Sequence, residues 1–153
     1  MIPSGWVVPL PIALPNVLWA LFPGPEAASP PATSESPLWR FASLIEGAGR
    51  VAVFTLPFVL DWNVETAFDR VLVSMGGLAL ALYYVAWSRY FLCGRADRLL
   101  FAALGPVSVP LAIAPILYFV AFAGLAGSST MGAVTAVFGA AHILLSLRRS
   151  RSA

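Results

Sequence analysis

Charged residues are scarce in this chain. Only 10% of its 153 residues are charged, whereas 59% are hydrophobic. A water-soluble domain needs a mostly polar perimeter, so this composition excludes that class. Runs that alternate polar and apolar residues with a period of two are also missing, which argues against a transmembrane β-barrel. We therefore predict an all-α, polytopic transmembrane helical bundle that forms a single integral membrane domain over residues 1–153.

Lysine is absent, and cysteine is nearly so. All nine basic residues are arginines, and most of them lie at the ends of apolar runs. This placement is typical of membrane orientation and argues against a nucleic-acid partner. The single cysteine, Cys93, excludes an internal disulfide, and nothing around it matches a redox or metal-ligand spacing.

Familiar catalytic motifs are missing too. The sequence contains no P-loop, no GxGxxG, no HExxH and no paired cysteines. Its single histidine, His142, makes a Ser–His–acid triad hard to assemble, and no serine stands out as the nucleophile. Asp61, Glu65 and Asp69 recur every four residues in a predicted loop, where they either collect a divalent cation or, as we expect, are solvated. We expect no cofactor and no metal.

Five apolar segments are candidate membrane spans, which makes four helices plus a Pro-broken N-terminal fifth. They cover residues 6–22, 38–60, 71–92, 99–123 and 130–147. Pro9, Pro11 and Pro15 interrupt the first segment, because each proline removes a backbone donor and clashes with the preceding turn. That segment is either a kinked span or a re-entrant or surface-lying one. Residues 23–37 are rich in Pro, Ala, Ser and Glu and predict a polar connector.

The arginines predict how the chain is threaded. With five crossings, eight of the nine fall on one side of the membrane and only Arg70 falls on the other. Arginine collects in cytoplasmic loops, so we expect the N-terminus outside and the C-terminus in the cytoplasm. The predicted location is a plasma or inner membrane, crossed several times.

Three of the predicted helices carry a narrow face of small and polar residues on a helical wheel. These faces are Ser43, Glu46, Arg50, Pro57 and Asp61 in the second helix, Arg70, Ser74, Gly77, Ala81, Tyr84 and Ser88 in the third, and Ser128, Gly132, Thr135, Gly139, His142 and Ser146 in the fifth. Such a face either packs helices together, because small residues let backbones approach, or lines a polar pathway. We expect the rest of each helix to face lipid.

Depth along the helices groups the candidate site residues. Glu46, Arg50, Tyr84 and His142 all fall about 16 to 22 Å below the outer helix ends, at 1.5 Å per residue. Pro110 lies at a similar depth inside the predicted fourth helix, where it leaves the carbonyl of Pro106 without a helical donor. An unpaired charge near the bilayer centre costs at least about 2.5 kcal/mol. Glu46 and Arg50 are therefore expected to pair at i,i+4, and the neighbouring glycines allow a helix or a ligand to approach them.

Function divides into three alternatives. The first is a non-catalytic membrane component that assembles with itself, as a homo-oligomer, or with a partner membrane protein. The second is a small transporter or channel subunit, with Glu46, Arg50, Tyr84 and His142 around a polar binding site in the inner half of the membrane. The third is an enzyme acting on a lipid or an isoprenoid. The lipid bilayer is a partner in all three.

Overall fold

The computed structural model describes residues 4–25 and 36–151, and most of them are helical. Its elements are η1 (Ser4–Val7), α1 (Pro9–Leu21), α2 (Pro37–Thr55), η2 (Leu56–Val59), α3 (Ala67–Leu92), α4 (Arg98–Phe101), α5 (Pro110–Leu125) and α6 (Ser129–Ser150). Within the described residues there is no sheet, only an isolated bridge between Leu104 and Val107. The all-α prediction is confirmed.

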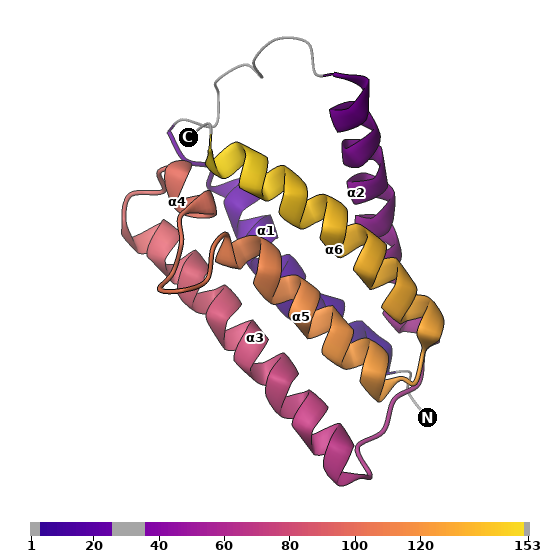
Figure 1. Ribbon diagram of the computed structural model, residues 1–153. Coiled ribbons are helices and arrows are strands. Elements are labelled where there is room, and N and C mark those ends of the chain that lie inside the picture. The colour runs from indigo at the N-terminus through magenta and orange to yellow at the C-terminus, as the bar shows by residue number, and fades with distance from the viewer. Residues whose placement is uncertain (1–3, 26–35, 152–153) are drawn as a thin grey trace.

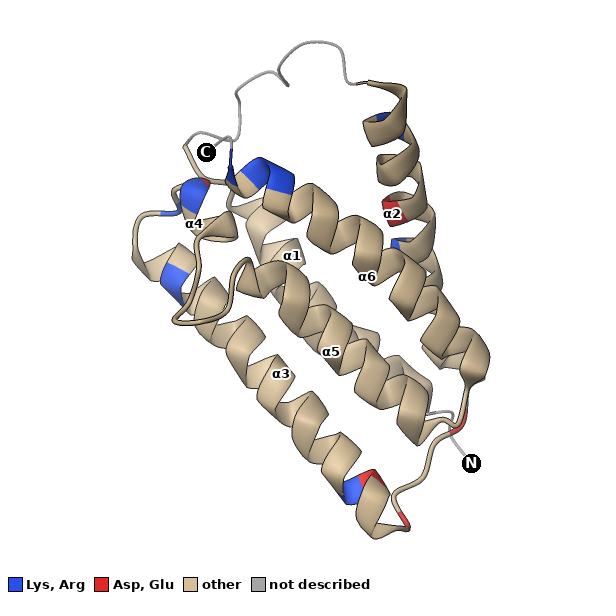
Figure 2. Ribbon diagram, viewed as in Figure 1, with Lys and Arg blue, Asp and Glu red and all other residues tan. Residues whose placement is uncertain are grey.

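The long helices form a row with one helix behind it (Figure 1). Helices α3, α5, α6 and α2 pack side by side in that order, and successive long helices run in opposite directions. Helix α1 crosses behind the row and contacts α3 and α2. Figure 2 shows basic residues gathered at the end of the bundle where α4 meets the C-terminal end of α6. We call this the arginine-rich end.

Three helical segments are long and apolar enough to cross a bilayer. They are Pro37–Val59, Ala67–Leu92 and Ser129–Ser150. Two further apolar helices, Gly5–Leu21 and Pro110–Leu125, are shorter. The 16 residues of α5 rise only about 24 Å, less than the roughly 30 Å of a hydrocarbon core. The fold is therefore helical with three candidate membrane spans, as expected of a multi-pass membrane protein.

The predicted continuous helix over residues 99–123 is wrong between 102 and 109. The short α4 ends before this stretch, and α5 begins after it at Pro110. Pro110 thus stands at the first position of a helix, where the missing N–H costs no hydrogen bond. Pro106 lies in the intervening turn, so the prediction of an orphaned Pro106 carbonyl inside a helix is also wrong.

Arg89 from α3 satisfies the carbonyls that this break exposes. Its guanidinium donates to the carbonyls of Ala102 and Ala103 at 2.7 Å each, and to that of Leu99 at 3.3 Å. Non-helical backbone at membrane depth is tolerated where the protein itself supplies the missing partners. The arginine therefore secures the break between α4 and α5.

The prolines of the first segment do not break the helix but remove one hydrogen bond from its interior. The first turn of α1 absorbs two of the three prolines, and Pro15 sits inside the helix. Because Pro15 has no N–H, the carbonyl of Pro11 lacks its helical donor. The Tyr84 hydroxyl donates to that carbonyl at 3.0 Å, and the neighbouring Tyr83 hydroxyl donates to the Ile12 carbonyl at 3.1 Å. Two tyrosines of α3 thus hold α1 in place.

The helix faces differ from those expected. The small and polar face predicted on α3 is turned outward, with Ser74, Gly77, Ala81 and Ser88 all exposed. The buried face of α3 is instead small and aliphatic in its N-terminal half, and in its C-terminal half it is rich in aromatic residues, namely Tyr83, Trp87 and Tyr90. In α6 the predicted face is half buried, with Thr135, Gly139 and Ser146 enclosed. Met131, Phe138, Ala141 and Leu145 outside that face are buried too, because α6 packs between α5 and α2.

The start of α3 is set by a capping box. The Thr66 side chain accepts from the N–H of Asp69 at 3.1 Å, and the Asp69 carboxylate accepts from the N–H of Thr66 at 2.8 Å. The helix therefore begins at Ala67, one turn before the predicted start at residue 71. Asp69, which the sequence also offered as a cation ligand, is used to cap the helix.

The other predicted boundaries are close to those observed. Helix α2 with η2 ends at Val59 rather than 60, and α6 runs from Ser129 to Ser150 rather than over 130–147. The polar connector predicted at 23–37 falls largely on residues 26–35, outside the described residues, and stays a prediction.

Candidate functional site

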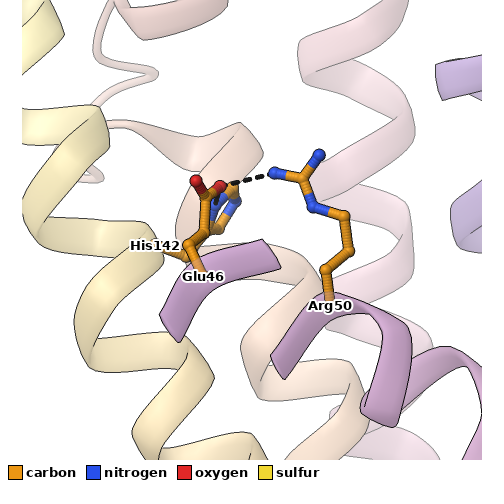
Figure 3. Close-up of polar contacts among 3 residues, drawn as sticks. All are labelled: Glu46, Arg50 and His142. Carbon is orange, nitrogen blue, oxygen red and sulfur yellow. Dashed lines mark hydrogen bonds and ion pairs between the residues drawn. The ribbon is translucent and has the colours of Figure 1, made fainter. Parts of the chain in front are cut away.

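Glu46 is the centre of a three-residue cluster (Figure 3). Its Oε1 accepts a hydrogen bond from Arg50 Nη2 at 2.5 Å and lies 2.8 Å from Nδ1 of His142. Glu46 and Arg50 are one turn apart on α2, whereas His142 comes from α6. The Glu46 side chain is 9% exposed and that of Arg50 is 55% exposed. The structure therefore brings together three of the four residues that the sequence grouped by depth.

The tautomer of His142 follows from its partner. When Glu46 is ionised its carboxylate only accepts hydrogen bonds, and Nδ1 of His142 then carries the proton in their contact. One oxygen of Glu46 thus serves a cation on its own helix and an imidazole on the next. Removing either partner from so buried a carboxylate would leave the charge poorly compensated.

Close helix contact holds the cluster in place. A Cβ atom added to Gly49 of α2 would lie only 2.7 Å from Cβ of Phe138 on α6, so glycine is what lets the two backbones approach. Phe138 stacks on the His142 ring, with centroids 5.2 Å apart and planes at 18°. Nearer the arginine-rich end, the Arg148 guanidinium lies 4.4 Å from the ring of Trp39. Of Gly47 and Gly49, the two glycines beside the pair, Gly49 has the expected close neighbour and Gly47 does not.

Arg50 and His142 also line a cavity of about 600 Å³, which we call the central cavity. It lies where α1 crosses behind the row of helices, and all six α-helices contribute to its walls. The walls are mainly apolar and aromatic, including Ile12, Phe54, Tyr83, Trp87, Phe119 and Phe138. The polar lining residues are Asn16, Arg50, His142, Ser146 and Arg149. A volume of this size is typical of pockets that bury most of a small ligand.

The opening of the central cavity lies between α1 and α2. The lining residues that are exposed are Asn16, Val17 and Ala20 on α1, Arg50 and Val51 on α2, and Arg149 on α6. Helix α2 packs mainly on α6 and makes only a small contact with α1. Two arginines, Arg50 and Arg149, are therefore among the exposed residues of the lining.

Tyr84, the fourth predicted site residue, does not line the central cavity and bonds to α1 instead. Its hydroxyl is bonded to the carbonyl of Pro11, on the side of α3 that faces α1. Arg149 and Asn16 are polar lining residues that the sequence placed neither in the candidate site nor on a polar helix face. Arg149 follows His142 by two helical turns and so shares its face of α6, a signal obscured by its position in the terminal arginine cluster. Asn16 stands alone in an apolar run, which by itself points to a polar partner.

The comparisons with known proteins supply no identity. The chain matches no protein-family model, no curated protein and no solved structure. Its function therefore has to be inferred from its own residues.

Proposed function

We propose that this protein is a non-catalytic, multi-pass membrane protein that binds a small ligand in the central cavity, as a transporter or ligand-binding subunit. The observation that supports this best is the coincidence of the Glu46–Arg50–His142 cluster with the opening of a 600 Å³ cavity. Of the alternatives that the sequence left open, this one gives both the cavity and the charges a role.

Exposure of Arg50 is difficult to explain by packing alone. A purely structural ion pair at this depth would be expected to turn neither charge toward lipid, because a charge facing lipid is costly. Glu46 is enclosed in that way, but Arg50 is more than half exposed and lines the opening. One side of its guanidinium holds Glu46, and the rest is available to an anion.

The arrangement of His142 favours binding over hydrolysis. Its ring stacks on Phe138, one turn toward the N-terminal end of α6. The nearest serine on that face, Ser146, lies one turn in the opposite direction. A Ser–His–acid relay needs the nucleophile hydrogen-bonded to the free ring nitrogen, and within the described residues no serine hydroxyl bonds to His142.

Thiol accessibility tests the proposal without knowledge of the ligand. Ala112 and Ala114 are both buried in α5, but Ala112 lines the central cavity and Ala114 does not. In a Cys93→Ser background, we expect a small thiol reagent to label Ala112→Cys in the delipidated protein in detergent and to leave Ala114→Cys unlabelled. Protection of both cysteines would show a dry, closed core and would contradict the proposal.

Assembly is a second candidate, which the exposed face of α3 favours. Ser74, Gly77, Ala81 and Ser88 form a small and polar surface there, and such surfaces allow close helix contact in lipid. We expect Gly77→Leu to lower the oligomeric mass in mild detergent and the neighbouring Leu78→Ala to leave it unchanged. An unchanged mass for Gly77→Leu would contradict assembly through this face.

A plasma or inner membrane, with the arginine-rich end in the cytoplasm, is the proposed location.

A further inference from the structure

We infer that the central cavity binds a single-chain amphiphile with an anionic headgroup, which enters sideways from the bilayer between α1 and α2. This inference rests on the proposed binding function and names its ligand class. The shared chemistry is a phosphate or carboxylate attached to one acyl chain, as in a lysophospholipid or a fatty acid.

The lining of the cavity changes from charged to apolar along α6. Four of its residues share one face and line the cavity, namely Phe138, His142, Ser146 and Arg149. Arg149 lies near the arginine-rich end, and Phe138 lies about 16 Å deeper along the helix axis. A lipid in the adjacent leaflet has the same order, with its headgroup at the interface and its chain toward the midplane.

The charge at the opening favours an anion. Arg50 and Arg149 both line the cavity and are exposed, while the nearby carboxylate of Glu46 is already engaged by Arg50 and His142. The net formal charge of these three residues is therefore positive, because two arginines stand against one carboxylate. Arginine is suited to this task, because its planar guanidinium bonds phosphate or carboxylate oxygens in pairs.

The deeper part of the cavity fits an acyl chain. Most of the lining is apolar or aromatic and includes Ile12, Phe54, Trp87 and Phe119, while its charged lining residues within the described chain are Arg50 and Arg149. A volume of about 600 Å³ lies in the range of pockets for small ligands. One chain suits this space better than the two chains of an ordinary phospholipid.

The opening faces lipid rather than water. The exposed lining residues Val17 and Val51 lie on α1 and α2, and both helices are apolar. Entry from the bilayer keeps the chain in an apolar environment throughout. Entry from water would require the chain to be desolvated again at the protein.

Native mass spectrometry of the intact protein tests the headgroup. The probes are palmitoyl lysophosphatidylglycerol and palmitate, with palmitoyl lysophosphatidylcholine as the probe without net charge. We expect both anionic probes to bind more tightly, and Arg149→Gln to weaken them by about tenfold or more. Arg148→Gln is the matched control, because Arg148 stacks on Trp39 and does not line the cavity.

A second pair of variants tests the route. Val17 and Leu14 are about equally exposed on α1, at 52% and 53%, but only Val17 lines the cavity. Val17→Trp should slow the uptake of lysophosphatidylglycerol, and Leu14→Trp should not. Equal slowing by the two variants, or none by Val17→Trp, would overturn the sideways route.

The outcomes separate this inference from the proposed function. Equal binding of the charged and zwitterionic lysolipids, or equal effects of Arg148→Gln and Arg149→Gln, would overturn the anionic headgroup. Labelling of Ala112→Cys without binding of any of the three probes would overturn the ligand class and leave a ligand-binding cavity. Protection of Ala112→Cys would remove the proposed function itself.

Discussion

At the scale of single residues, polar groups in this chain lie where an apolar helix has an uncompensated charge or an unpaired backbone carbonyl. Glu46 and Arg50 meet each other's charge, and Tyr84 supplies the hydrogen bond that Pro15 removes from Pro11. The pair was predictable from sequence, because i,i+4 spacing fixes its geometry within one helix. The role of Tyr84 was not, since it depends on how α1 lies against α3, which no single-helix pattern specifies.

Tyr84 and Pro15 should therefore be energetically coupled. Tyr84→Phe removes the donor to the Pro11 carbonyl and should lower the free energy of unfolding by about 1 kcal/mol, which thermal unfolding in detergent measures. In a Pro15→Ala background, the N–H of the new alanine reaches that carbonyl, so Tyr84→Phe should cost clearly less. Equal costs in both backgrounds would show that the tyrosine stabilises the fold in another way.

At the scale of helices, the sequence pattern predicts where a helix lies in the chain but not which face it buries, because the buried face depends on the neighbouring helices. The helical periods and most boundaries were predictable, because apolar runs of sufficient length form helices in lipid. The orientation of α3 was not, since its aromatic residues fill the core and its small face turns outward. The break between α4 and α5 likewise depends on Arg89, a residue of another helix.

The contact between α5 and α6 gives a test at this scale. A Cβ atom at Gly139 would lie 2.8 Å from the Ile116 side chain, so there is no room for a larger residue. Gly139→Leu should destabilise the protein by about 1 to 3 kcal/mol, measured by thermal unfolding in detergent. The adjacent Ala140 is exposed, and Ala140→Leu should be tolerated. Similar losses in the two variants would mean that this contact is not tight.

At the scale of the whole molecule, alternating helices place the basic residues at one end. The N-terminal element η1 packs against η2 at the opposite end from α4, so the two ends of the described chain lie at opposite ends of the bundle. The up-and-down path was predictable from the positions of the polar loops. The central cavity was not, because it results from the way α1 crosses behind the row.

Orientation can be tested with the native cysteine. Cys93 is exposed and caps the C-terminal end of α3, two residues before Arg95. We expect an impermeant thiol reagent added to intact cells to leave the unmodified protein unlabelled and to label a Cys93→Ser, Glu65→Cys variant. Labelling of Cys93 and protection of the cysteine at position 65 would reverse the proposed topology.

We propose that the charges at Glu46 and Arg50 serve a ligand as well as the fold, and one measurement separates the two roles. It is the rise in melting temperature that palmitoyl lysophosphatidylglycerol causes in the native protein and in the Glu46→Gln, Arg50→Gln and double variants. Each single variant should melt lower without ligand, because it strands a charge, and the double variant should regain much of that loss. We expect the double variant nevertheless to lose most of the ligand-induced rise, since the Arg50 guanidinium that lines the cavity is gone. A double variant that recovers both its stability and the full rise would show that the pair is purely structural and would contradict the claim.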